Sequence, residues 1–177
     1  PFLPRLLQNA KVRNHGLDEA ALDGAARQIA GEMDRDALYA IGPGRSAKGV
    51  IQALGLAGAM LGTDLILDRK IIAPDANERT ILEAAAERKL RIVVGVIGGQ
   101  GYIFGRGNQE LSPAVIRRAG REAITIIASQ QKLLALEDQR LLVDTGDPAL
   151  DRDLAGYWRV VVGPREEMVM KVEAPGV

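Results

Sequence analysis

Cysteine is absent from the sequence, which excludes a disulfide framework and a thiolate metal site. An excess of charge of either sign is missing as well, because 23 basic residues balance 23 acidic ones. A protein that depends on nucleic-acid phosphates normally carries a basic excess, so we do not expect nucleic acid as a partner. No run approaches the roughly 18 apolar residues of a membrane-spanning helix. Since no signal-peptide pattern is present either, we expect a cytoplasmic protein that does not bind membranes.

The residues that are present are typical of a globular protein, with 47% hydrophobic and 26% charged residues. A length of 177 residues suffices for one domain with a sizeable core. We therefore expect residues 1–177 to form a single domain, with an irregular entry over 1–16 and an amphipathic helix over 17–33. The first residue is not methionine, so we treat the chain as part of a longer protein.

Short apolar runs alternate with helical patterns along the rest of the chain. The runs that predict strands are residues 37–41, 63–68, 91–97, 123–128 and 140–143, followed by 157–162 and 168–172. This alternation predicts the α/β class, with an open, mainly parallel sheet, helices on both faces and a short antiparallel strand pair at the C-terminus. Ligands of such sheets collect beyond the carboxyl ends of the strands.

The most distinctive stretch is the glycine-rich segment Gly98–Gln109, which follows the predicted strand 91–97 and precedes a helix that begins at Ser112-Pro113. Glycine has no Cβ atom, so its backbone can turn sharply or approach a ligand closely. Backbone N–H groups of such a loop can bind an anion. The candidate phosphate-binding or nucleotide-binding residues here are Gly98, Gly99, Gly101, Gly105, Arg106, Asn108 and Gln109.

A second glycine turn joins the predicted strand 37–41 to a helix over 47–54, and its candidate phosphate-binding residues are Gly42, Gly44, Arg45 and Ser46. Ser46 is the expected N-cap of the helix, and Arg45 is the expected partner of an anion. A phosphate site and a plain strand-to-helix turn explain this pattern equally well. Lys132, just past a predicted strand, is a further candidate, although a surface lysine is the commoner outcome.

Acidic and amide side chains form a second set of candidates. Asp64 lies between apolar residues and is the candidate catalytic residue. The candidates for ribose hydroxyls or Mg²⁺ are Asp75, Asn77, Glu78, Asp144 and Asp147. A solvated loop, with Asn77 as the N-cap of a helix over 78–88, explains the first three of these as well. No metal site is assigned.

These polar segments all follow predicted strands, so we expect them to meet at one edge of the sheet. They are Gly42–Ser46, Asp64–Asp68, Gly98–Asn108, Ser129–Lys132 and Asp144–Asp147. Their convergence indicates a phosphate or nucleotide site more strongly than any one motif does.

Several motifs resemble the C-terminal half of ATP- or polyphosphate-dependent NAD kinases, the branch that includes the acetoin-catabolism protein X group. The motifs are Leu38–Gly44, Leu61–Asp64, Asp75–Glu78, Ile97–Gly101, Phe104–Gln109, Leu142–Asp147 and Gly156-Tyr157. They occur in order and run over nearly the whole chain.

This resemblance implies transfer of a phosphoryl group from ATP or polyphosphate to the adenosine 2′-hydroxyl of NAD, with Mg²⁺ as the metal. Arg106 would then clamp a phosphate, and Asp64 would bind the metal or the hydroxyl. Family members carry a Gly-Gly-Asp-Gly motif in an N-terminal half, which this sequence lacks. The resemblance thus implies a missing N-terminal domain as a partner and no activity of the isolated chain. A homo-oligomer is left open.

A more distant likeness is to ribose-5-phosphate isomerase and related sugar-phosphate-binding domains. It rests on Gly42–Ser46, Asp64, Gly98–Gly101 and Lys132. The isomerase pattern of two aspartates followed by a glutamate is not reproduced. The alternative function is therefore an autonomous sugar-phosphate-binding domain, either a sensor or an isomerase-like enzyme, and the likeness also implies an α/β sheet.

Overall fold

The computed structural model describes the backbone of residues 3–175 and the side chains of residues 16–175. Within this range, nine strands form one sheet in the order β3-β2-β1-β4-β6-β8-β9-β7-β5. The strands are β1 (Leu38–Ile41), β2 (Thr63–Leu67), β3 (Lys70–Ala76), β4 (Leu90–Val94), β5 (Tyr102–Phe104), β6 (Ile124–Ile127), β7 (Arg140–Val143), β8 (Gly156–Gly163) and β9 (Glu166–Glu173).

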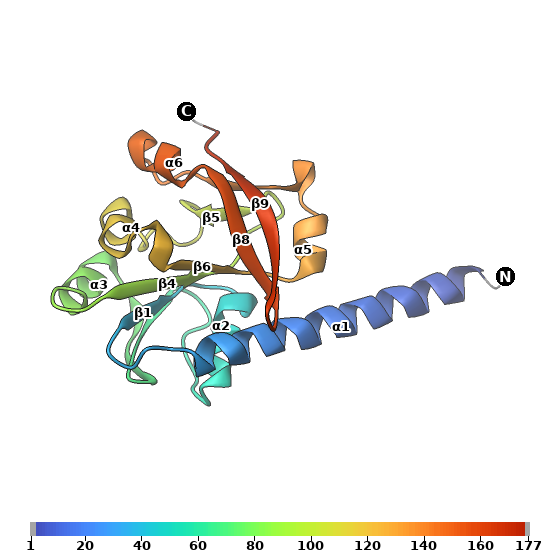
Figure 1. Ribbon diagram of the computed structural model, residues 1–177, viewed down its shortest axis with the longest axis horizontal. Helices are drawn as coiled ribbons and strands as arrows, with labels where there is room; N and C mark the ends of the chain where they lie inside the picture. The colour runs from blue at the N-terminus through green and yellow to red at the C-terminus, as the bar shows by residue number, and fades with distance from the viewer. Residues whose placement is uncertain (1–2, 176–177) are drawn as a thin grey trace.

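Helices occupy most of the connections. They are α1 (Leu3–Gly31), α2 (Arg45–Ala53), α3 (Glu78–Ala84), α4 (Pro113–Ala119), α5 (Gln130–Leu134) and α6 (Pro148–Leu154), with short 3₁₀ turns η1 (Arg121–Ala123) and η2 (Glu137–Gln139). The α/β class is confirmed, as is the antiparallel pair β8–β9 near the C-terminus. In Figure 1 this pair runs steeply across the view, whereas β4 and β6 lie nearly horizontal in the same twisted sheet.

The sheet has a parallel centre, in which β1, β4, β6 and β8 all run the same way. β2 runs antiparallel to β1, and β9 runs antiparallel to β8. Because β7 is parallel to β9, and β5 to β7, these two strands also oppose the central four. The sheet is therefore mixed at both ends. The carboxyl ends of β2, β5, β7 and β9 lie on the opposite side of the sheet from those of β1, β4, β6 and β8.

Two apolar layers cover the two faces of the sheet. One contains side chains of α1 and α2, such as Ala25, Ala30 and Ile51, packed against Tyr39 and Val93. The other layer is larger and contains side chains of α3, α4 and α6. Adjacent strand residues alternate between the layers, as the pleat of a strand requires. The prediction of helices on both faces is thus confirmed.

Two details of the fold differ from the sequence expectation. Residues 3–16 are helical and belong to α1, although glycine and asparagine at positions 14–16 suggested an irregular entry. Residues 102–104 form the short strand β5 inside the segment expected to be one continuous loop. A strand of three residues is too short to leave a recognisable period in the sequence.

Candidate functional site

The site begins where the chain leaves β1 and β4, two parallel neighbours in the sheet. From β1 the chain enters α2, whose Ala47 and Val50 lie in the same apolar layer as Tyr39. From β4 it continues to α4, whose Val115 and Ile116 lie in the opposite layer. The two connections thus pack on opposite faces of the sheet, and open α/β sheets bind ligands outside the carboxyl ends of the strands at such a point.

The first turn of α2 lies at this point, because α2 follows β1 after a short turn. Its N-cap is Gly44, which has a positive φ of 99° and provides no side-chain hydrogen bond to the helix. The first N–H groups of a helix have no partner within the helix, so they remain available to an anion. Ser46 was expected as the N-cap, but it lies inside the helix. The helix begins earlier because glycine readily adopts the left-handed backbone that the turn needs.

Gly95 directly follows β4 and lies beside the first turn of α2, although the apolar pattern predicted a strand over 91–97. A methyl group on its Cα would stand 3.8 Å from the Cβ atom of Ser46 and 3.8 Å from the carbonyl oxygen of Ile127. The carboxyl ends of β1, β4 and β6 therefore meet here. We call the group formed by Gly42–Ser46, Gly95 and Ile127–Ser129 the strand-end site. In the sequence, the only indication that Gly95 belongs to a site is its position directly after the apolar run 92–94.

Two neighbouring carboxylates of α1 reach over this site. Glu19 forms an ion pair with Arg45, with 3.4 Å between Oε1 and Nη2. Asp18 accepts a hydrogen bond from the backbone N–H of Gln131 at 2.8 Å, at the start of α5. Adjacent residues of one helix thus contact two of the predicted phosphate-binding segments, Gly42–Ser46 and Ser129–Lys132. The structure brings these two segments together. The carboxylate of Glu19 lies beside the first segment and that of Asp18 beside the second.

Asp64 lies next to the site but inside the protein, with its side chain fully buried. Its Oδ2 atom accepts hydrogen bonds from Lys48 Nζ at 2.9 Å and from the N–H of Ala59 at 3.0 Å. Its Oδ1 atom accepts one from the N–H of Asp75 at 2.9 Å. Lys48 also donates to the carbonyl oxygen of Gly62. This environment gives Asp64 a structural role, while a role in catalysis or metal binding stays a prediction.

The other polar candidates on this side are helix and loop residues. Asn77 caps α3 by accepting a hydrogen bond from the N–H of Thr80 at 2.8 Å, as expected. Asp75 and Glu78 are exposed on either side of it. Lys132 is half-buried beside Ser129, whose hydroxyl accepts a hydrogen bond from the N–H of Lys132 and caps α5.

The glycine-rich segment is built differently from the single anion loop that the sequence suggested. Gly98–Gly101 is the turn of a hairpin, closed by two backbone hydrogen bonds between Ile97 and Tyr102. Gly99 and Gly101 differ sharply within it, because a Cβ atom on Gly99 would meet nothing within 4 Å, while one on Gly101 would stand 2.9 Å from the carbonyl oxygen of Arg140. Glycine is therefore needed at position 101 because the backbone of Arg140 lies close to it, and no ligand is required to explain it.

The second half of that segment faces β7. A Cβ atom on Gly105 would stand 1.8 Å from the carbonyl oxygen of Asp144. Arg106 pairs with Asp144 at 3.5 Å and lies 5.0 Å from the ring centre of Tyr102. Asn108 is fully buried and donates to the carbonyl oxygen of Ile103, which leaves its Oδ1 atom without a partner among the described residues.

The expectation that all polar segments meet at one edge is wrong for β2 and β7. Asp64 stands at the start of β2 and is level with Ile41 at the end of β1, whereas Asp68 follows the opposite end of β2. Since β7 opposes the central strands, Asp144–Asp147 leaves the sheet in the other direction. Asp147 there caps α6 and pairs with Arg117. Strand direction cannot be deduced from apolar runs, because a period-two pattern is the same in both directions.

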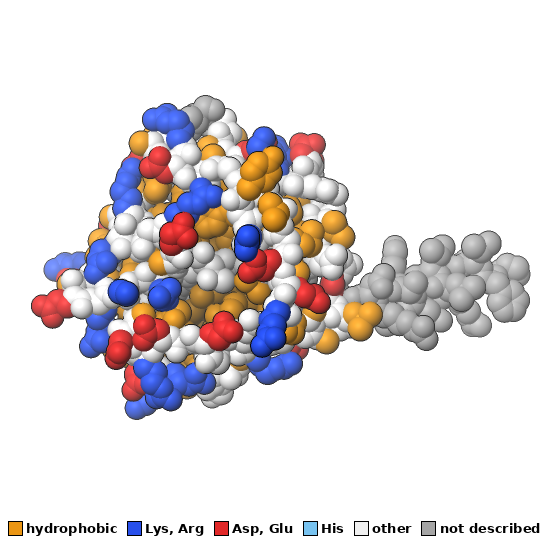
Figure 2. All heavy atoms as spheres, viewed as in Figure 1, with side chains coloured by type: hydrophobic (Ala, Val, Ile, Leu, Met, Phe, Trp, Pro, Cys, Tyr) orange, Lys and Arg blue, Asp and Glu red, His pale blue; other side chains and the backbone are white. Residues whose placement is uncertain are grey.

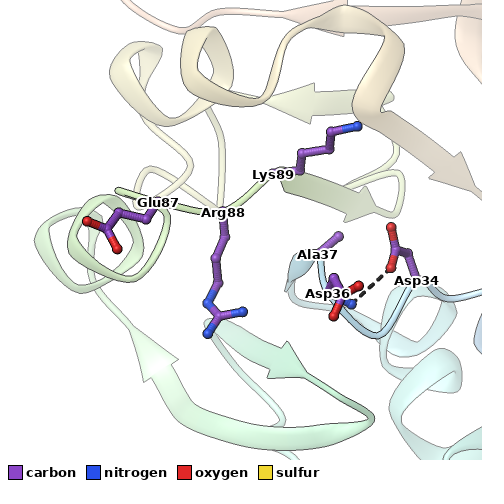
Figure 3. Close-up of a pocket in the computed structure, with 6 residues that line it drawn as sticks. All are labelled: Asp34, Asp36, Ala37, Glu87, Arg88 and Lys89. Atoms are coloured by element: carbon purple, nitrogen blue, oxygen red, sulfur yellow. Dashed lines mark hydrogen bonds between the residues drawn. The ribbon is translucent and has the colours of Figure 1, made fainter.

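A hollow of about 550 Å³ lies at the opposite end of β1 and β4, away from the strand-end site. Figure 3 shows its lining, with Asp34, Asp36 and Ala37 on the turn before β1, and Glu87, Arg88 and Lys89 before β4. The N–H of Asp36 donates to the carboxylate of Asp34 at 2.9 Å. Its lining carries both signs of charge, so its composition does not indicate an anion site.

The fold thus places the first turn of α2 at the carboxyl ends of β1, β4 and β6. Comparison with protein-family models matches residues 34–172 to the ATP-NAD kinase C-terminal domain. The match covers well over half of the chain, and the chain belongs to this family. Searches of the curated proteins and of the solved structures returned no match.

Two further searches concern the described part of the chain alone. None of its helices is both long and apolar enough to cross a membrane. Among the same residues, no three histidine, aspartate or glutamate side chains gather in a way that could hold a metal ion. Mg²⁺ in proteins is often held by only one or two carboxylates together with substrate phosphates.

Proposed function

We propose that the chain binds a phosphate group of a nucleotide at the strand-end site, as the C-terminal domain of an NAD kinase-like phosphotransferase. One observation carries this proposal, namely the first turn of α2, which has no side-chain cap and lies at the carboxyl ends of β1 and β4. A helix N-terminus at the carboxyl ends of parallel strands offers N–H donors and a favourable dipole to a phosphate. Membership of the family supports the nucleotide as the ligand.

The substrates that this proposal implies are NAD and a phosphoryl donor, either ATP or polyphosphate. In the reaction, the adenosine 2′-hydroxyl oxygen of NAD forms a bond to the transferred phosphorus while the donor's bond to that phosphorus breaks. The products are NADP, ADP or a polyphosphate shortened by one phosphate, and the released hydroxyl proton. Catalysis of such transfer consists largely of positioning and of charge neutralisation. The first N–H groups of α2 and the guanidinium of Arg45 would supply part of that neutralisation. A domain outside this chain would supply the rest.

Isothermal titration calorimetry of the chain with NAD, NADP and ATP tests the proposal. We expect saturable binding of at least one of the three, weakened in Arg45→Gln and in Gly95→Val. The first variant removes the cation, and the second places a branched side chain between Ser46 and Ile127. The matched control is Arg79→Gln, because Arg79 is an exposed arginine on α3 that pairs only with Glu83 four residues away among the described side chains.

Two results would contradict the proposal. One is an absence of binding by all three nucleotides, with and without Mg²⁺. The other is binding that Arg45→Gln, Gly95→Val and Arg79→Gln leave equally strong. Pentose and hexose phosphates form a comparison series, since sugar-phosphate binding without nucleotide binding would favour a sugar-phosphate domain instead.

A further inference from the structure

We propose a second anion site, distinct from the strand-end site, in a hollow of about 380 Å³ between the starts of β4 and β6. Four basic residues line it, namely Lys89, Arg91, Arg118 and Arg121, against the single carboxylate Glu122. We call it the basic hollow. It lies at the other end of β4, about 15 Å from the strand-end site at the rise of an extended strand.

Two of the three guanidinium groups, those of Arg118 and Arg121, are held in place by the fold. Arg118 Nη2 donates to the carbonyl oxygens of Ala85 and Arg88, at 2.5 and 2.7 Å. The Nη1 and Nη2 atoms of Arg121 donate to three backbone carbonyl oxygens just before and at the start of β8. The Arg121 guanidinium also lies over the ring of Trp158, 4.4 Å from its centre. Cations held in this way lose little side-chain entropy when a ligand arrives.

The charge of these groups is not balanced by carboxylates. Among the residues whose side chains the structure describes, none of the four cations is in a salt bridge. The Nε atom of Arg91 is buried and has no hydrogen-bond acceptor within residues 16–175. Leaving a buried N–H donor without an acceptor costs about 1–3 kcal/mol. Both observations favour an anion with hydrogen-bond acceptor oxygens as the ligand of the basic hollow.

The neighbouring hollow of Figure 3 provides a comparison, because the two share Lys89. There, Asp34, Asp36 and Glu87 outnumber the two basic residues, so an anion would be repelled. Figure 2 shows acidic and basic side chains interspersed over the face in view. The excess of basic residues thus distinguishes the lining of the basic hollow from that of its neighbour.

The expected ligand is a small phosphate-class anion, such as a phosphate monoester. A phosphate monoester carries nearly two negative charges at neutral pH and offers three acceptor oxygens, which suits several cations that converge from different elements. The lining also contains Leu90, Ala119, Gly120 and Ala123, whose small or apolar side chains leave room for a compact body attached to the phosphate.

Nuclear magnetic resonance of the isotopically labelled chain tests this site, with inorganic phosphate, methyl phosphate and citrate as the probes at constant ionic strength. We expect saturable shifts of the backbone amides of 89–91 and 118–123 with both phosphates, and weaker binding of citrate. Arg91→Gln should reduce phosphate affinity about tenfold, the loss of one charge-assisted hydrogen bond. Lys89→Gln is a second variant that keeps the test valid if the first disturbs folding.

The matched control is Arg159→Gln, because Arg159 is an exposed arginine on β8 that does not line the hollow. Shifts that do not saturate, or that are confined to 42–46 and 95, would overturn the proposal. So would equal phosphate affinity in the two hollow variants and the control. Citrate binding more tightly than phosphate would overturn the assigned ligand class. The outcome is independent of nucleotide binding at the strand-end site, because the two sets of amides are at opposite ends of β4.

Discussion

Lys48 and Asp64 form a buried ion pair, with 2.9 Å between Nζ and Oδ2 and side-chain exposures of 9% and 0%. The pair ties α2 to the start of β2 and holds the loop that contains Ala59 and Gly62. Removing one partner would leave an uncompensated buried charge. We expect Lys48→Met to lower the free energy of unfolding by about 3–5 kcal/mol, measured by urea denaturation.

The control for this measurement is Arg35→Met, which breaks the exposed pair between Arg35 and Asp68. Exposed pairs contribute at most about 1 kcal/mol, so this change should be small. Equal effects of the two substitutions would contradict the structural role of Lys48 and Asp64.

Asp18 and Glu19 should compete with a nucleotide phosphate. Asp18 accepts a hydrogen bond from the N–H of Gln131, and Glu19 pairs with Arg45, so both carboxylates occupy positions that a phosphate oxygen would use. We expect the double substitution Asp18→Asn, Glu19→Gln to tighten nucleotide binding severalfold in calorimetric titrations. The conservative control is Asp23→Asn, an exposed position on the same helix. Weaker binding in the double variant would instead mean that these carboxylates help to organise the site.

Substitution by alanine should affect stability very differently at two glycines of the segment Gly98–Gln109. Gly105 has a φ of 95° and a Cβ position 1.8 Å from the carbonyl oxygen of Asp144. Gly105→Ala should therefore destabilise the protein by more than about 2 kcal/mol. Gly99→Ala meets nothing within 4 Å and should change stability by less than about 0.5 kcal/mol. Thermal unfolding compares them, and a strong loss of nucleotide binding in folded Gly99→Ala would restore the turn as a ligand-binding loop.

Asp147 should titrate at unusually low pH. A hydrogen bond from Arg117 at 2.5 Å, helped by the N–H of Leu150, lowers the pKa of Asp147 from its usual 3.8 to about 2. Because the folded pKa is depressed, its contribution to stability is complete above about pH 4 and is lost as the pH falls through about 2. Carboxyl-carbon NMR measures the pKa directly. Arg117→Gln should raise it toward 3.8, and an unchanged pKa would show that the backbone donor dominates.

Local features of the fold could be predicted from the sequence where a short pattern determines them. The apolar runs located β1, β4, β6 and β7 to within a few residues, since burial on both faces requires continuous apolar side chains. The helix caps Asn77 and Ser112 followed from their place before a helical pattern. Asn and Ser at such positions accept hydrogen bonds from the first turn whatever the rest of the protein does.

Features that depend on distant contacts could not be predicted. Lys48 and Asp64 are 16 positions apart in the sequence, and no local pattern signals that the candidate catalytic aspartate has a buried ammonium group as its partner. The antiparallel direction of β7, which moved Asp144 away from the strand-end site, arises from its pairing with β9 much later in the chain. Gly95 could be assigned to the strand-end site only from its contacts with Ser46 and Ile127, which lie on other elements.

Helix α1 has a practical consequence for anyone who excises this domain. The family match begins at residue 34, three residues after α1 ends at Gly31. Yet Ala25, Ala26 and Ala30 are at most 2% exposed and complete one of the two apolar layers. A gene fragment trimmed to the family boundary would encode a protein with a bare hydrophobic flank over β1 and α2. Poor yield from such a fragment would reflect the cloning boundary, and a start upstream of α1 is the remedy.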